Sequence, residues 1–283
     1  MVMNDAIFLE NDRGLFILSV VRMIKEKLIY NDIKDALDEY MSDSQIGARP
    51  KRGIRDHLFV IYSIIHSVKR KEGNPIDIQM IDIRKCFDTL WLEECINNLF
   101  EAGIQDDILA MIFEGNSKNE VAVQTPVGIT ERIPIERIVM QGGVLGAPMC
   151  SLSIDKICKD SSQNKEFLYQ YKGEVDIPLL GMVDDGLLVT ECGIKSVEAN
   201  AFLNSRIELI KLEMNKNKSH KIHIGANSSK CPSLLVHDDE MQESVAEKYL
   251  GDIVSHNGNN TKNIKSRISK SMGTISDIKN ILR

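Results

Sequence analysis

The stretch that most constrains the fold of this chain is LLGMVDDGLLV, residues 179–189, where two adjacent carboxylates interrupt an apolar run. Short apolar segments on either side of a polar pair and a glycine are typical of two buried strands joined by a tight turn. Asp184 and Asp185 would then lie at that turn. Taken alone, a hairpin with a polar turn is an ordinary structural feature and implies no chemistry.

A second predicted strand also ends in a carboxylate. The segment IDIQMIDI, residues 76–83, has the alternation of a strand, and a helical pattern follows directly after Asp82. If the two strands are neighbours, Asp82 meets at least one of Asp184 and Asp185 at an edge of the sheet. Carboxylates that lie so close together repel each other unless protons or divalent cations neutralise them. We therefore expect a metal site whose oxygen ligands favour Mg²⁺, with Mn²⁺ as a possible substitute, over Zn²⁺.

The remaining segments predict an α+β fold with an antiparallel sheet backed by helices. Apolar residues recur at helical spacing in residues 15–40, 56–72, 84–103, 106–115, 147–160 and 197–214. Alternating patterns predict further strands in residues 119–139, 219–225 and 247–255. No internal repeat or long linker marks a domain boundary.

Composition narrows the class of protein. A chain of 283 residues can bury a substantial core, and no apolar run approaches the roughly 18 residues of a membrane span. We expect an intracellular protein, cytoplasmic and nuclear, without membrane association. The net charge is −6, yet basic residues cluster locally, as phosphate contacts require. The six cysteines form no CxxC pair, so we expect reduced thiols and no zinc site. They are Cys86, Cys95, Cys150, Cys158, Cys192 and Cys231.

Two Mg²⁺ or Mn²⁺ ions a few ångströms apart are the usual apparatus for phosphoryl or nucleotidyl transfer. Two other classes of protein use comparable carboxylates. A receiver domain carries its acidic pair near the start of a much shorter chain, whereas the pair here comes late. A metal-dependent phosphohydrolase would use the same ions, but the basic segment RPKRGIR at 49–55 and the loop QGGVLGAP at 141–148 would then have no purpose. Both alternatives are less favoured than a nucleotidyl transfer enzyme.

The order of the motifs resembles that of the reverse transcriptases, and within them the non-LTR (LINE-type) retrotransposon enzymes. IDIRKCFDTL at 81–90 resembles their first catalytic motif, and MVDDGLLV resembles the aspartate box, with Met182 where the family often has an aromatic residue. The resemblance implies that Asp82, Asp184 and Asp185 are catalytic and bind two Mg²⁺ ions. It favours Asp184 over Asp185 for direct ligation.

Further motifs imply contacts with substrates. QGGVLGAP resembles the loop that faces the incoming nucleotide, Phe87 holds the position of a ring that rejects ribonucleotides, and EKYLGDIVS at 247–255 is similar to the primer grip. The implied nucleotide-binding residues are Arg13, Arg49, Arg52, Phe87, Gln141, Gly142 and Lys218. The implied primer-grip residues are Tyr249, Leu250 and Gly251.

The resemblance implies the fingers and palm of a right-hand polymerase. Residues 1–75 would form the fingers and 76–255 the palm, with a finger insertion near 104–140. Residues 256–283 would form a connection or the start of a thumb that is largely absent. The implied activity is RNA-directed DNA synthesis from an RNA template, a DNA primer and deoxynucleoside triphosphates. The alternative is an inactive or truncated fragment that at most binds nucleic acid. The oligomeric state is not predicted.

Overall fold

The computed structural model describes residues 17–117, 119–135, 142–225, 231–258 and 261–281. The chain forms two compact units. Unit 1 comprises Met1–Met41 and Arg84–Ser153, and unit 2 comprises Ser42–Ile83 and Ile154–Arg283. The three predicted catalytic carboxylates all belong to unit 2.

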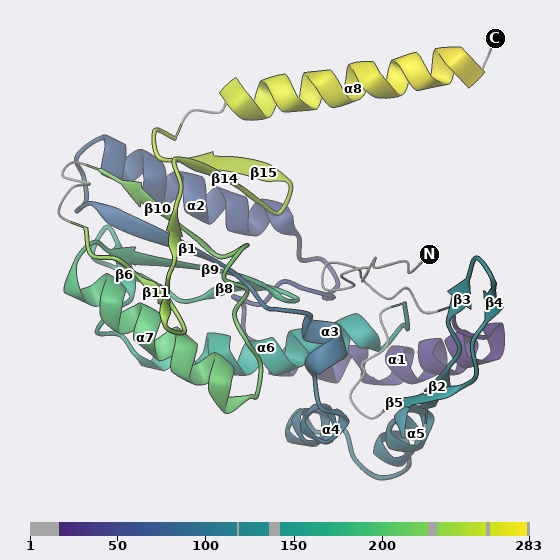
Figure 1. The fold of residues 1–283 in the computed structure, drawn as a ribbon. Helices are drawn as coiled ribbons and strands as arrows, with labels where there is room; N and C mark the ends of the chain where they lie inside the picture. Colours follow the sequence, from purple (N-terminus) through teal and green to yellow (C-terminus); the bar gives the residue numbers. More distant parts are fainter. Residues whose placement is uncertain (1–16, 118, 136–141, 226–230, 259–260, 282–283) are drawn as a thin grey trace, which may run out of the picture. The chain divides into compact units, whose positions relative to one another are not determined.

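Unit 2 is built around a five-stranded sheet with the order β13-β10-β1-β9-β8 (Figure 1). All of its strand pairs are antiparallel except the short parallel pair β10–β13. The strands are β1 (Ile76–Asp82), β8 (Leu180–Met182), β9 (Asp185–Glu191), β10 (His220–Ile224) and β13 (Gln242–Glu243). The central strand, β1, is therefore flanked by the strand that begins with Asp185.

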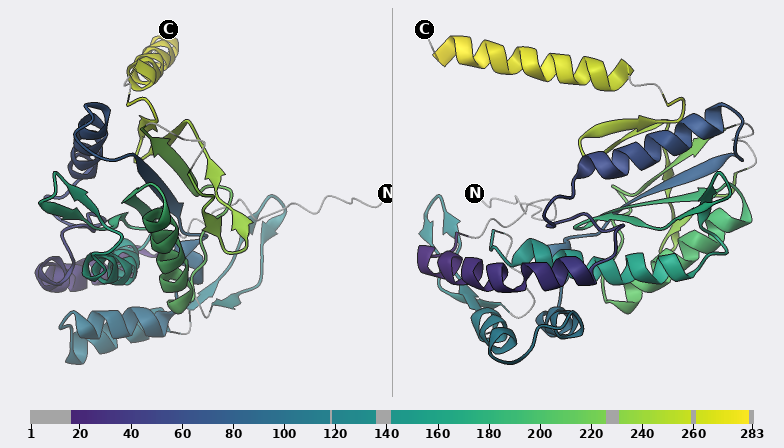
Figure 2. Two further views of the ribbon diagram at one scale, coloured as in Figure 1. Left: turned by 90° about the vertical axis from the view of Figure 1, so that its left-hand side faces the viewer. Right: turned by 180° about the vertical axis from the view of Figure 1, so that it is seen from behind.

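Helices cover both faces of this sheet. Helix α2 (Ile54–Lys69) lies on one face and α7 (Ile194–Leu209) on the other (Figures 1 and 2). Ile61 and Ile65 of α2 belong to the same buried cluster as Ile78 of β1. Burial of this apolar area is the main force that holds the helix on the sheet. On the opposite face, Gln79 donates from Nε2 to the carbonyl of Ser196 in α7 at 3.2 Å.

Among the described residues, unit 2 also contains three further hairpins, a C-terminal helix and the second half of a helix shared with unit 1. The hairpins and the C-terminal helix are β6 (Tyr169–Tyr171) with β7 (Val175–Ile177), β11 (Leu235–Val236) with β12 (Asp239–Glu240), β14 (Ala246–Tyr249) with β15 (Asp252–Ser255), and α8 (Thr261–Ile281). The β14–β15 turn has φ of 48° at Leu250 and 87° at Gly251. Two successive positive φ angles define a type I′ turn, which matches the twist of a tight hairpin and favours glycine.

Unit 1 consists mainly of helices. They are α1 (Val20–Tyr40), α3 (Cys86–Thr89), α4 (Leu92–Glu101), α5 (Asp106–Asn116) and the first half of α6 (Gly146–Gln163), which continues into unit 2. Two short strand pairs join them: β2 (Asn119–Val121) with β5 (Ile133–Ile135), and β3 (Gln124–Thr125) with β4 (Gly128–Ile129). These pairs agree with the strands predicted in residues 119–139 as far as residue 135, and residues 136–139 lie outside the described residues.

The prediction of one helix over residues 84–103 is wrong. Leu90 and Trp91 have extended backbones, with ψ of 130° and 133°, and they separate α3 from α4. A new helix can begin there because Glu93 and Glu94 occupy its first turn, where the helix dipole favours negative charge. The α+β class, with its antiparallel sheet backed by helices, is confirmed. No helix in the described parts of the chain has the length and apolar character needed to cross a membrane.

Candidate active site

Two carboxylates from different strands meet at one end of the central strand pair. Asp82, the last residue of β1, is the register partner of Asp185, the first residue of β9. Directly opposed residues of an antiparallel pair share one face of the sheet, with Cβ atoms about 4.5–5.5 Å apart. Both side chains are half-buried. The two strands are thus neighbours, as the sequence predicts, and Asp82 and Asp185 lie directly opposite each other.

Asp184 occupies the turn between β8 and β9 and has different surroundings. Val183, just before it, has φ of 58°, an unusual conformation for a β-branched residue. The Val183 amide donates to Oε1 of Gln45 at 3.1 Å, which holds the turn in place. Asp184 borders an apolar space lined by Ile83, Ile157 and Ile207, among other residues. The register therefore pairs Asp185, rather than Asp184, with Asp82, and direct ligation by Asp184 stays a prediction.

The Asp82 carboxylate and backbone are held by the loop before β10. Asn215 donates from Nδ2 to Oδ2 of Asp82 at 3.0 Å and from its amide to the Asp82 carbonyl at 2.8 Å. The Asp82 amide donates in turn to Oγ of Ser219 at 3.2 Å. The motif resemblance covers the asparagine and the Lys-Ser pair of this segment, NKNKS at 215–219, but implies a substrate contact only for Lys218. Its asparagine and serine fix the position of Asp82.

A hollow of about 250 Å³ opens beside the paired carboxylates. Its lining includes Asp82, Asp185, Lys218, Tyr249 and Leu250. The hollow thus joins two predicted metal ligands, the predicted phosphate-binding lysine and part of the predicted primer grip. These residues come from four separate segments of unit 2. Lys218 is exposed and places a positive charge beside two carboxylates.

Tyr249 is an anchor of the β14–β15 hairpin rather than a surface residue. Its side chain is 4% exposed and belongs to the core cluster of unit 2. Its hydroxyl lies 3.2 Å from Nδ1 of His57, whose Nε2 lies 3.0 Å from the Ser44 carbonyl. A carbonyl can only accept, so Nε2 carries the proton and Nδ1 accepts from the tyrosine. Burial, with the nearby Asp185 charge, raises the pKa of Tyr249.

Burial also lowers the pKa of His57 to about 4, so this imidazole is neutral at physiological pH. It links the hairpin to the loop that precedes α2, because one ring nitrogen contacts Tyr249 and the other contacts the Ser44 carbonyl. Leu250 and Gly251 lie at the tip of the hairpin, and Leu250 borders the hollow. The hairpin is therefore positioned by buried polar contacts and not by packing alone.

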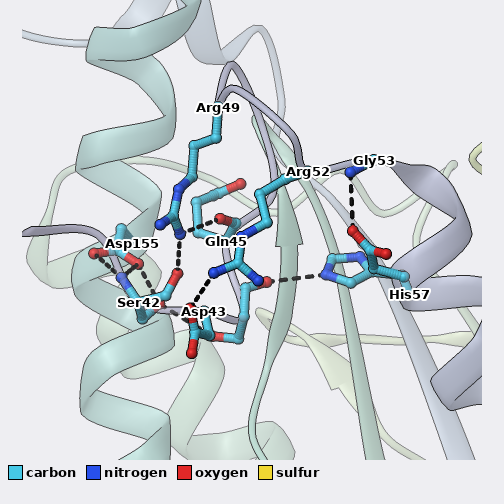
Figure 3. Close-up of polar contacts among 10 residues, drawn as sticks. Ser42, Asp43, Gln45, Arg49, Arg52, Gly53, His57 and Asp155 are labelled. Atoms are coloured by element: carbon cyan, nitrogen blue, oxygen red, sulfur yellow. Dashed lines mark hydrogen bonds and ion pairs between the residues drawn. The ribbon is translucent and has the colours of Figure 1, made fainter. Parts of the chain in front are cut away.

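The two predicted arginines of the loop before α2 make different polar contacts (Figure 3) and differ in accessibility. Arg49 is 9% exposed, and its Nη1 donates to the carbonyls of Ser42 and Gln45 at 2.5 and 3.0 Å. Arg52 forms an ion pair with Asp43, and its side chain is 37% exposed. Arg49 thus holds the loop together, and Arg52 is the more accessible to an anionic ligand.

Two predicted nucleotide contacts belong to unit 1. Phe87 lies half-buried in α3, and Gly142 is exposed with φ of 114°, a conformation that favours glycine. Glu26 of α1, missed in the sequence, accepts from the Val144 amide at 2.7 Å and thereby anchors the loop after Gly142. In the sequence, the only indication of this role was a charged residue among the apolar positions of a predicted helix. The predicted residues Arg13 and Gln141 lie outside the described residues.

Comparison with known proteins identifies the family and the fold. A family model described as reverse transcriptase (RNA-dependent DNA polymerase) matches residues 11–254. Among solved structures, a Candida albicans telomerase in complex with a fragment (TWJ) of telomeric RNA is similar, with a TM-score of 0.51 and 16% identity over 84% of this chain and 37% of that one. An apo telomerase from Candida tropicalis has a TM-score of 0.56 and 13% identity over 83% and 40%. No curated protein matches.

The chain spans less than half the length of these telomerase chains, and at such identity the likeness shows the fold alone. That fold is the reverse transcriptase fold, as the motif order predicts. Members of the family are nucleotidyltransferases, and they generally use divalent metal ions. The family model covers most of this chain and includes both strands that carry the paired carboxylates. The chain therefore belongs to the reverse transcriptase family, the RNA-dependent DNA polymerases.

Proposed function

We propose that this chain is an RNA-directed DNA polymerase that adds deoxynucleotides to the 3′ hydroxyl of a DNA primer on an RNA template. The observation that carries the proposal is the hollow that joins Asp82, Asp185 and Lys218 to the β14–β15 hairpin. It combines ligands for cations, a cation for phosphate and a hairpin suited to a primer. Family membership supports the same activity.

The carboxylates fit a pair of Mg²⁺ ions, with Mn²⁺ as a possible substitute. The donors are oxygens only, and two of them are half-buried in register on one face of the sheet. Asp82 and Asp184 would hold both ions, with Asp185 in support. When bound, the ions would activate the primer hydroxyl and stabilise the leaving pyrophosphate. Asn215 contributes by keeping the Asp82 carboxylate oriented.

Other residues would bind and orient the substrates. Lys218 at the rim of the hollow attracts the triphosphate, and the predicted arginines Arg13, Arg49 and Arg52 assist it, with Arg52 the most accessible of the two that the structure describes. Positive charges of this kind raise the local concentration of an anionic substrate. The remaining proposed contacts are the ring of Phe87 against the sugar, Gln141 and Gly142 against the nucleotide, and Tyr249, Leu250 and Gly251 against the primer.

The motif order supports an origin in a non-LTR retrotransposon protein. The proposed organisation has fingers in residues 1–75, a palm in 76–255 with a finger insertion near 104–140, and the start of a thumb in 256–283. The β14–β15 hairpin, which would close the palm, packs on the core of unit 2 through Tyr249. The RNA template, DNA primer and deoxynucleoside triphosphates are the partners that this organisation requires.

The test is primer extension on an RNA template, comparing the native chain with Asp184→Ala in Mg²⁺ and in Mn²⁺. We expect incorporation by the native chain and a loss in the variant. Asp238→Ala is the matched control, because Asp238 is an exposed aspartate at the β11–β12 turn, outside the hollow. Equal incorporation by the native chain and Asp184→Ala would contradict the metal assignment. No incorporation by either would favour a fragment that only binds nucleic acid.

A further inference from the structure

Unit 2 contains a second group of potential metal ligands, away from the carboxylate hollow. Asp77, Cys192, His223 and Cys231 place one ligand atom each within 4.8 Å of all the others. Asp77 lies near the start of β1, whereas Asp82 lies at its end. The activity proposed above has no use for these four side chains.

Strand register creates this group. Asp77 of β1 is the register partner of His223 in β10, and Oδ1 of Asp77 lies 2.9 Å from Nδ1 of His223. Cys231 brings its Sγ to 3.1 Å from the same nitrogen. Cys192 follows β9 directly, and its amide donates to the Pro75 carbonyl at 2.9 Å. Asp77, Cys192 and the pair His223 and Cys231, which are eight positions apart, therefore bring three distant parts of the chain to one point.

The segment that carries Cys231 is held by a buried lysine. Lys221 is 2% exposed, and its Nζ donates to the carbonyl of Pro232 at 3.0 Å. The same ammonium group pairs with Glu243 at 3.2 Å. A buried cation of this kind needs such partners to offset its loss of hydration. Lys221 thus fixes the residue next to Cys231 and adds positive charge near the group.

A second, independent observation points to a missing ligand. Asp77 is 0% exposed, yet its Oδ2 has no hydrogen-bond partner among the described residues. Thr190 on β9 is the register partner of Asp77. Its Oγ1 is also buried without a hydrogen-bond partner among the described residues. An unsatisfied buried carboxylate oxygen is costly, and native proteins pair such oxygens or use them to bind metal ions.

We propose that Asp77, Cys192, His223 and Cys231 bind one Zn²⁺ ion as a structural site. Two thiolates, an imidazole and a carboxylate are ligands that zinc accepts, and thiolates exclude Mg²⁺ and Ca²⁺. Zinc bonds of this kind give a tetrahedron with edges of about 3.3–3.8 Å. The separations of 2.9 and 3.1 Å are close to these edges, so small side-chain movements suffice. Four protein ligands leave no position for substrate, which is typical of structural sites.

Ion binding would displace protons. Burial, together with the neighbouring Cys231 and Asp77, raises the pKa of the Cys192 thiol, so the thiol is protonated when no metal is bound. Zn²⁺ binds the thiolate form of cysteine, so binding at this site would release the Cys192 proton to solvent. The two thiolates and the carboxylate carry one more charge than the ion, and Lys221 is near enough to offset it.

Cobalt substitution tests the site. The full chain, reduced and freed of metal, is titrated with Co²⁺ and then with Zn²⁺. We expect one equivalent of Co²⁺ to give the visible bands of a tetrahedral ion and a thiolate charge-transfer band, with release of thiol protons, and Zn²⁺ to displace the Co²⁺ and abolish these bands. Cys192→Ser and Cys231→Ser should lose the charge-transfer intensity. Cys95→Ser is the matched control, a buried thiol beside Ser153 in unit 1, and should keep it.

Asp77→Asn provides a second test of the site in case the serine variants fail to fold. It retains the shape of the side chain and both thiols, so we expect weaker Zn²⁺ binding with the charge-transfer band still present. The proposal is overturned if the native chain gives no charge-transfer band, or if both serine variants keep it. It is also overturned if the chain contains a Cys192–Cys231 disulfide by mass spectrometry and takes up no metal after reduction. None of these outcomes depends on polymerase activity.

Discussion

Acidification from about pH 7.5 to about pH 5 should destabilise this protein through His57 alone by about 2 kcal/mol. The ring is 2% exposed, with Nδ1 accepting from Tyr249 and Nε2 donating to the Ser44 carbonyl. Protonation of Nδ1 would place an N–H donor opposite the Tyr249 hydroxyl, which already donates to that nitrogen. Burial lowers the pKa of His57 from the ordinary 6.5 to about 4, while the Ser44 carbonyl and Asp56 act in the opposite direction.

The direction of the change in stability with pH follows from which state of the chain binds the proton. Between pH 6.5 and about 4 the unfolded chain binds a proton at His57 and the folded chain does not. The free energy of unfolding therefore falls as the pH falls through this window. The whole difference in pKa corresponds to about 3 kcal/mol, of which about 2 kcal/mol is lost by pH 5.

The assay is urea unfolding at both pH values, followed by circular dichroism. His57→Gln removes the titration, so it should lose about 2 kcal/mol less than the native chain over the same pH change. His66→Gln is the matched control, because His66 is an exposed histidine of the same helix, and it should follow the native chain. If His57→Gln and the native chain lose equal stability, the buried neutral imidazole is refuted.

Three further predictions concern single side chains. Tyr249→Phe leaves Nδ1 of the buried His57 without its donor and should lower the free energy of unfolding by urea by about 1–3 kcal/mol. An unchanged free energy of unfolding would show that this hydrogen bond does not stabilise the fold. Gly181→Ala would place a Cβ 2.8 Å from Nε2 of Gln45 and should lower the free energy of unfolding by about 1–3 kcal/mol. Gly115→Ala in α5 would place a Cβ in open space and should raise the free energy of unfolding by about 0.5–1 kcal/mol. Equal effects of the two variants would contradict the packing around Gly181. Asn215→Ala should slow primer extension and leave the unfolding midpoint nearly unchanged; an unchanged rate would show that Asp82 needs no such support.

The paired carboxylates could be predicted because their positions are local properties of two strands. Asp82 follows an alternating segment, and the aspartate pair interrupts an apolar one, so strand ends were visible in the sequence. The preference between Asp184 and Asp185 could not be derived in the same way. It depends on the register of β1 against β9, which pairs Asp82 with Asp185, and on the turn at Val183.

Other features were out of reach for a similar physical reason. The group around Asp77 has no recognisable spacing, because its ligands come together only through cross-strand pairing and a loop closure. The basic segment RPKRGIR does not show which of its arginines is buried, and only the structure shows that Arg49 donates to backbone carbonyls of its own loop. Trp91 interrupts a continuous helical pattern, since apolar periodicity does not record where the backbone extends.

The most direct test of the central claim is single-nucleotide incorporation on an RNA template, comparing the native chain with Asp82→Asn. Asp82 is the carboxylate that the hollow, the register with Asp185 and the bond from Asn215 all place at the site. We predict that the native chain adds the nucleotide complementary to the template base and that Asp82→Asn adds none, with the same unfolding midpoint. Equal incorporation by a folded Asp82→Asn variant would contradict the assignment of this hollow as the active site.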